Sequence, residues 1–175
     1  MSNIMLDIET LSNTVNSAVI QVSLVKFDWD KDCQNPEKLQ LNLHVDEQIK
    51  KGLDINSDTL AWWLDTNPEL LKTILKHNGS VEFALTEIQN FITLDDCIWC
   101  HATFDVPILA NLFNKFNKRL PWKYTRVRDI RTLIDLAELD LSQYDWKNEK
   151  THDSLDDCMF QIKYCKDAMK KLKGV

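Results

Sequence analysis

The chain has 175 residues, 44% of them hydrophobic and 27% charged, which is ordinary for one soluble domain with its own core, residues 1–175. No apolar run approaches the ~18 residues of a membrane span, and the N-terminus lacks the basic and apolar regions of a signal peptide. A cytoplasmic protein without a membrane partner is therefore expected, with its five cysteines reduced. Cys97 and Cys100 would fall on opposite faces of a strand, which favours buried cysteines over a redox or zinc pair.

Three strand-like segments begin the chain, and a group of helices follows. The strands are expected at Asn3–Glu9, Ala18–Trp29 and Lys38–Val45. The helices are expected at Asp58–Asp65 with Asn56 or Ser57 as the cap, at Pro68–His77, and at Val81–Ile92 with Ser80 as the cap.

Strands and helices alternate in the second half of the chain. The expected elements are a strand at Cys97–His101, a helix at about Thr103–Asn117, a strand at about Tyr124–Ile130, a helix at Arg131–Leu139, a loop at Gln143–Lys150 and a helix at about Asp153–Lys171. The order βββ-α-β-α-β-α predicts an α/β fold of the ribonuclease-H-like kind. In this arrangement an antiparallel three-strand meander and parallel strands form one mixed sheet flanked by helices.

The first strand carries two carboxylates on one face. Because side chains alternate along a strand, Asp7 and Glu9 point away from the face that carries Ile4, Leu6 and Ile8. Two adjacent, half-buried carboxylates repel each other and lose hydration, so either one of them keeps its proton or a cation lies between them. Hard oxygen ligands of this kind favour Mg²⁺ or Mn²⁺.

Two later helices carry further acids. Asp105 heads the apolar stripe formed by Leu109, Leu112 and Phe116, which favours a metal ligand over an acid placed only to complement the helix dipole. At about 100° per residue, Asp157 lies at the edge of the apolar face of the last helix, whereas Asp156 points to solvent. His152 precedes this helix and, taken alone, reads as a surface loop histidine.

Positive charge is concentrated in one segment, although the net charge of the chain is −6. Between residues 115 and 131 there is one acid, Asp129, against seven basic residues: Lys115, Lys118, Arg119, Lys123, Arg126, Arg128 and Arg131. The segment is either a solvated loop or, beside a carboxylate-metal site, a surface that guides phosphates.

Together these pieces resemble a known family. The order Asp7-x-Glu9, Phe104-Asp105 and His152-x-x-x-x-Asp157 resembles the three motifs of the DEDD 3′→5′ exonucleases, histidine subclass. The chain is also similar to the phage DexA-type exodeoxyribonucleases and their bacterial exoribonuclease-like relatives. This likeness runs from Met5 to about Tyr164 and includes Met5-Leu6-Asp7-Ile8-Glu9-Thr10-Leu11, Thr59-Leu60-Ala61-Trp62-Trp63, Arg128-Asp129-Ile130-Arg131-Thr132-Leu133 and His152-Asp153-Ser154-Leu155-Asp156-Asp157.

The resemblance implies roles for these residues. Asp7, Glu9, Asp105 and Asp157 would hold two Mg²⁺ or Mn²⁺ ions, and His152 would accept a proton from the attacking water. The implied substrate contacts are Thr10, Leu11, His101, Phe104, Arg128 and Arg131. Leu11 reads equally well as a core residue. Trp62 and Trp63 are candidates for stacking bases, although a hydrophobic lid is the favoured interpretation.

The resemblance predicts a metal-dependent 3′→5′ exonuclease that removes nucleoside 5′-monophosphates from single-stranded or 3′-overhanging DNA or RNA, with DNA slightly favoured. It is compatible with a homodimer and with a bacterial cell or a phage-infected host. One rival is a catalytically silent nucleic-acid-binding module of the same fold, which would be free to lose a ligand. A ribonuclease-H-like endonuclease would not need the His152-x-x-x-x-Asp157 spacing.

Overall fold

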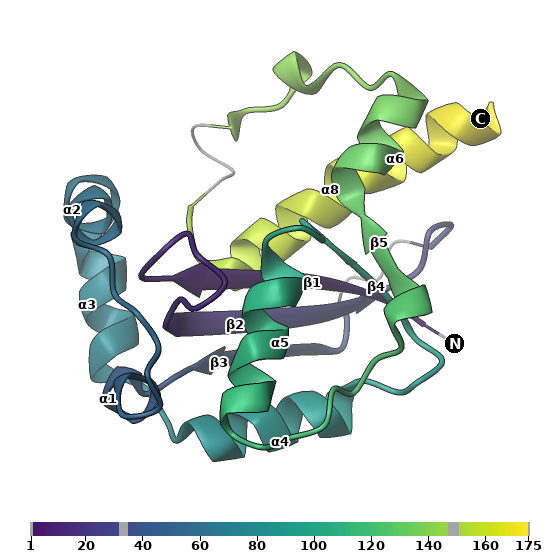
Figure 1. Cartoon of the computed structure of the whole chain (residues 1–175). Helices are drawn as coiled ribbons and strands as arrows, with labels where there is room; N and C mark the ends of the chain where they lie inside the picture. The colour runs from purple at the N-terminus through teal and green to yellow at the C-terminus, as the bar shows by residue number, and fades with distance from the viewer. Residues whose placement is uncertain (1, 32–34, 147–150, 175) are drawn as a thin grey trace.

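Five strands form one mixed sheet, in the spatial order β3-β2-β1-β4-β5, in the computed structural model (Figure 1). The structure describes residues 2–31, 35–146 and 151–174. The strands are β1 (Asn3–Thr10), β2 (Val19–Phe27), β3 (Lys38–Asn42), β4 (Cys97–Cys100) and β5 (Val127–Asp129). β1 to β3 form an antiparallel meander, while β4 is parallel to both β1 and β5. The predicted ribonuclease-H-like fold is confirmed.

Helices cover both faces of this sheet. They are α1 (Val45–Ile49), α2 (Ser57–Thr66), α3 (Pro68–Lys76), α4 (Val81–Phe91), α5 (Asp105–Lys115), α6 (Ile130–Ala137) and α8 (Ser154–Lys173), with 3₁₀ turns η1 (Tyr124–Arg126) and η2 (Leu141–Gln143). Figure 1 shows α4 and α5 on one face of the sheet and α6 and α8 on the other. α2 and α3 pack with the end of β1 and the start of β2 in a third cluster. Among the described residues, no helix is long and apolar enough to cross a membrane.

The two faces of β1 bury different sets of side chains. Ile4, Leu6 and Ile8 belong to the core beneath α4 and α5, whereas Met5 belongs to the core beneath α6 and α8. β1 lies in the middle of the sheet and is buried along nearly its whole length. The alternation therefore points Asp7 and Glu9 towards α8, as the sequence predicts.

Most predicted elements are present, with three differences. α1 was not predicted, because its five residues show no helical stripe. It is held by Gln48, whose buried amide bonds both backbone groups of Val19 on β2. Ser80 occupies the N-cap position of α4 but makes no side-chain capping bond, and Glu47 accepts the N–H of the first helical residue, Val81. The strand expected at Tyr124–Ile130 is only three residues long, since η1 replaces its beginning. The predicted loop at Gln143–Lys150 lies partly outside the described residues.

Candidate active site

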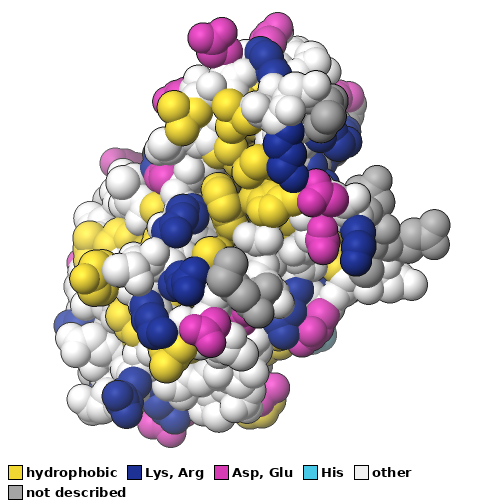
Figure 2. All heavy atoms as spheres, turned by 90° about the vertical axis from the view of Figure 1, so that its right-hand side faces the viewer, with side chains coloured by type: hydrophobic (Ala, Val, Ile, Leu, Met, Phe, Trp, Pro, Cys, Tyr) yellow, Lys and Arg dark blue, Asp and Glu magenta, His cyan; other side chains and the backbone are white. Residues whose placement is uncertain are grey.

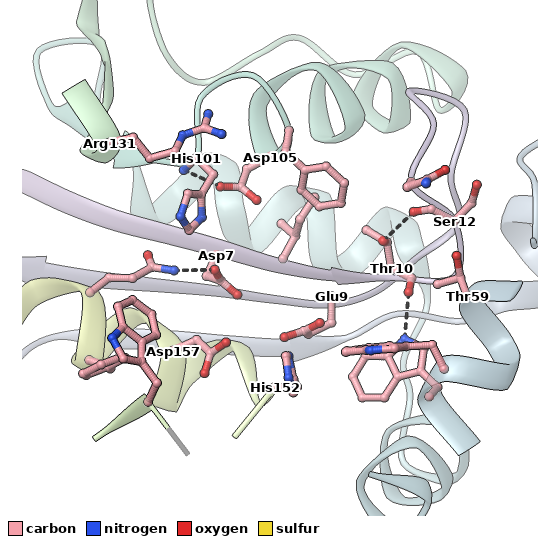
Figure 3. Close-up of a pocket in the computed structure, with 18 of the residues that line it drawn as sticks. Asp7, Glu9, Thr10, Ser12, Thr59, His101, Asp105, Arg131, His152 and Asp157 are labelled. Atoms are coloured by element: carbon pink, nitrogen blue, oxygen red, sulfur yellow. Dashed lines mark hydrogen bonds between the residues drawn. The ribbon is translucent and has the colours of Figure 1, made fainter. Parts of the chain in front are cut away.

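A cavity of about 500 Å³ lies where β1 ends, between the first turns of α5 and α8 and one side of α2. Figure 3 shows acids from three of these elements pointing into it. Asp7 and Glu9 come from β1, Asp105 comes from α5, and Asp157 comes from α8. All four are at most 9% exposed. Carboxylates this buried lose hydration and repel one another, so a positive charge or a bound proton is needed to offset their negative charge.

Asp105 is the most buried of the four acids, at 2% exposed. The backbone N–H of His101, directly after β4, donates to Asp105 Oδ2 over 2.7 Å and so fixes the Asp105 carboxylate beside the end of this strand. Burial raises the pKa of Asp105 well above its usual value, and the nearby charge of Asp7 raises it further. The raised pKa of Asp105 favours its protonated form in the absence of a cation.

The start of α8 delivers Asp157 to the same cavity. Asp157 is 4% exposed, whereas its neighbour Asp156 is exposed, which confirms the predicted orientation of the helix. The backbone N–H of Thr151 donates to Asp157 Oδ1 over 3.2 Å. Asp157, Glu9 and His152 each offer one ligand atom, and these three atoms lie within 4.8 Å of one another.

His152 lies beside these acids in a left-handed backbone conformation. Its φ is +60°, a conformation that is unfavourable for side chains other than glycine. The ring packs edge-to-face against exposed Trp62 of α2, with centroids 4.7 Å apart. Asn117 and Glu138 share this conformation at the ends of helices, whereas His152 adopts it beside two acids of the cavity. Its place next to Glu9 and Asp157 makes the plain loop histidine the weaker interpretation.

A polar network that the sequence analysis missed anchors the start of α8. Gln21 and Ser23 lie opposite Glu9 and Asp7 on β2. Gln21 Oε1 accepts from the backbone N–H and hydroxyl of Ser154, and the Ser23 and Ser154 hydroxyls are 2.7 Å apart. The period-two polar residues in the otherwise apolar segment Val19–Val25 were the available signal. These bonds hold α8 against β2 and so place both His152 and Asp157.

The expected substrate contacts divide into two groups. Thr10, His101, Phe104 and Arg131 line the cavity. Leu11 does not, because it is 2% exposed and packs in the core with α2 and α3. Arg128 is also absent from the lining, and its guanidinium donates to the backbone carbonyls of Thr125 and Val127. The structure therefore does not bring Leu11 and Arg128 to the cavity: Leu11 packs in the core and the Arg128 guanidinium is bonded to nearby backbone.

Arg131 is the part of the basic segment that reaches the cavity. It forms a two-bonded ion pair with Asp129, and this pair lowers the pKa of Asp129. Lys115 lies at the other end of α5 from Asp105, about 15 Å away for an eleven-residue helix. Lys123 pairs with Asp95. Figure 2, which shows the right-hand side of Figure 1, has Lys and Arg side chains interspersed with acids. Of the seven basic residues between 115 and 131, only Arg131 lines the cavity, and the phosphate-guiding role of the segment stays a prediction.

The two adjacent tryptophans of α2 take different places. Trp63 is fully buried, and its Nε1–H donates to the carbonyl of Thr10 over 2.9 Å. Trp62 is 42% exposed and lines the cavity. Of this pair, only Trp62 offers a ring face to a ligand. Trp63 instead fixes the backbone that follows the two acids of β1.

The donor set fits divalent cations. Four buried carboxylates line one cavity, and its other charged or ionisable lining groups are Arg131, His101, His152 and Tyr164. Hard oxygen ligands favour Mg²⁺ or Mn²⁺. Asp7, Glu9, Asp105 and Asp157 would hold such ions. A cation would remove the repulsion that raises the pKa of Asp105.

Adding Mg²⁺ or Mn²⁺ should raise the melting temperature, because ions that bind only the folded acids stabilise that state. At a hundredfold excess over Kd the gain is about 2.7 kcal/mol, or roughly 5–10 °C for a chain of this length. Differential scanning fluorimetry at millimolar Mn²⁺ measures this shift. An unchanged melting temperature would show that the acids do not bind the ion together.

Asp105→Asn should give an ion-free protein that is more stable than the native one near pH 7. The raised folded pKa of Asp105 means that folding takes up a proton, so its contribution is lost as pH rises above ~4, the unfolded value. Asparagine stays neutral, so the melting temperature of this variant should fall less with pH, and its Mn²⁺ shift should be smaller. Parallel pH profiles of native and variant protein would contradict the burial argument.

Two known proteins or families match this chain over a range that includes the whole cavity. The family model described as the 3′-5′ exoribonuclease Rv2179c-like domain matches residues 2–169. The chain is also similar to the exodeoxyribonuclease of Enterobacteria phage T4, with 25% identity that spans 100% of this chain and 92% of that protein. Both matches include every residue that lines the cavity.

Proposed function

Because the chain belongs to the family of the 3′-5′ exoribonuclease Rv2179c-like domain, we propose that it removes nucleoside 5′-monophosphates from 3′ ends in a metal-dependent reaction. Membership of this family makes it a nuclease, a hydrolase acting on nucleic acid. The observation that carries the proposal is the convergence of four buried acids and His152 on one cavity. This arrangement costs stability, which a catalytically silent module has no reason to retain.

Each residue has a proposed part in the reaction. Asp7, Glu9, Asp105 and Asp157 hold two divalent ions, which when bound supply an acidified water and neutralise charge on the phosphate. His152 accepts the proton of the attacking water, which its place beside Glu9 and Asp157 allows. The water oxygen would bond to the scissile phosphorus as the bond from phosphorus to the 3′-oxygen breaks. The leaving 3′-oxygen would take a proton from solvent, and His152 would return its proton to solvent, so that the products are a nucleoside 5′-monophosphate and a shortened strand with a 3′-hydroxyl.

The cavity extends beyond the acids on both sides, which suits a single strand. Thr10, Thr59 and Trp62 line one end, and Trp62 presents an exposed ring for a terminal base. Arg131 and His101 line the region on the other side of Asp105 and would meet the phosphates upstream of the cleaved bond. A duplex end would have to unpair before its 3′ nucleotide could reach the buried acids. Single strands and 3′ overhangs are therefore the proposed substrates.

DNA is the proposed preference, on the likeness to the phage exodeoxyribonuclease over the full length of the chain. The family description names an exoribonuclease, so RNA is the alternative polymer.

A 5′-labelled single strand with Mn²⁺ should yield a ladder that shortens one nucleotide at a time from the 3′ end. A 3′-labelled strand of the same sequence should release labelled mononucleotide first. Gel analysis of both, as DNA and as RNA, measures direction and preference together. Internal cuts at the earliest time points would instead support an endonuclease. Binding of the strand without cleavage, in Mg²⁺ and in Mn²⁺, would support the catalytically silent module.

A further inference from the structure

Gln161 is a buried glutamine that touches an acid of the site. It lies on α8 four residues after Asp157, so both side chains are on the same face of the helix. Gln161 is 4% exposed, and its Nε2–H donates to Asp7 Oδ1 over 2.6 Å. Figure 3 draws this bond as the dashed line that ends on Asp7.

The carbonyl oxygen of the Gln161 amide has no hydrogen-bond donor among the described residues. Because a carboxylate only accepts hydrogen bonds, the NH₂ group must face Asp7, and the Oε1 atom is buried without a hydrogen-bond donor among the described residues. Buried polar atoms are nearly always paired, because an unpaired one loses its hydration without compensation. The amide is thus poorly explained as support for the core.

Gln48 provides the contrast within the same chain. It is fully buried like Gln161, but both of its amide atoms are bonded to the backbone of β2. Gln48 therefore supports the fold, since its removal would leave two backbone groups of Val19 without partners. The Gln161 amide instead donates to a side chain, the carboxylate of Asp7.

We propose that Gln161 is a positioning residue for the cation site, and this inference rests on the proposed function. Its amide donates to one oxygen of Asp7 and so holds the carboxylate in a single orientation. A carboxylate held in this way keeps a fixed geometry towards a cation in the cavity. Outer partners that orient metal ligands in this way commonly contribute 10–100-fold to metal affinity.

The test compares Gln161→Met with Gln48→Met, a matched change at the structural glutamine. Isothermal titration with Mn²⁺ gives the Kd, and scanning fluorimetry without metal gives the melting temperature. Gln161→Met should weaken Mn²⁺ binding by roughly 10–100-fold. Its metal-free melting temperature should change less than that of Gln48→Met, because removal of the unpaired carbonyl offsets part of the loss of the bond to Asp7. Gln48→Met should lower the melting temperature and leave the Kd for Mn²⁺ unchanged at a temperature where it is folded.

The Kd is the decisive measurement. An unchanged Mn²⁺ Kd in Gln161→Met overturns the inference, whatever happens to stability, and Gln161→Leu repeats the test with a different apolar side chain. Native protein that binds no Mn²⁺ would overturn the proposed function itself. Native binding combined with an unchanged Kd in both Gln161 variants would overturn only the role of Gln161.

Discussion

Asp157→Ala should lose nearly all nuclease turnover, whereas Asp156→Ala should keep it. The two residues are adjacent on α8, but Asp157 is 4% exposed and faces the cavity, while Asp156 is exposed. Asp157 is proposed to hold a cation directly, so its loss should exceed the 10–100-fold typical of removing an outer partner of a metal ligand. Asp156 contacts the hydroxyl of Thr151 near the surface and should contribute little.

Initial rates on a 5′-labelled single strand with Mn²⁺ measure both variants, and circular dichroism establishes that each is folded. Asp7→Ala should match Asp157→Ala, because both acids line the same cavity from different elements. An active Asp157→Ala beside an inactive Asp156→Ala would mean that the proposed ligand on α8 is the wrong residue.

His152→Ala should lower turnover by roughly 10²–10⁴-fold, the usual contribution of a positioned base. The melting-temperature shift caused by Mn²⁺ should stay nearly intact, because His152 is proposed as a base and not as a ligand. Its ring lies close enough to Glu9 and Asp157 to serve as a ligand instead, so the Mn²⁺ shift separates the two roles. A variant that loses both activity and the metal shift would identify a ligand, and one at full rate would exclude His152 from catalysis.

His152→Gly is the matched variant for this experiment. Glycine adopts a φ of +60° without strain, so this change should keep or raise the melting temperature while it removes the imidazole. Low activity in a protein at least as stable as the native one would show that the loss is chemical rather than structural. Low activity with a large loss of stability would contradict the argument from strain.

The four acids and His152 are surrounded by a well-packed core. The core above and below β1 is apolar and buried, and the polar network of Gln21 and Ser154 fixes α8 on the sheet. Such a frame can tolerate repulsion among four carboxylates and one unfavourable backbone angle. Removing these features one at a time should therefore stabilise the metal-free protein in several cases, with Asp105→Asn and His152→Gly as the clearest examples.

The amino-acid sequence by itself determined the fold class, the face of β1 that carries Asp7 and Glu9, and the choice of Asp157 over Asp156. These depend on the periods of strand and helix, which local backbone geometry sets. Only the tertiary structure decided that Leu11 is core, that Arg128 turns away, that the basic segment reaches the cavity through Arg131, and that Gln161 bonds Asp7. Each of these depends on the packing and hydrogen bonds of the folded chain, several of them between residues far apart in the sequence, and a local pattern does not encode such contacts.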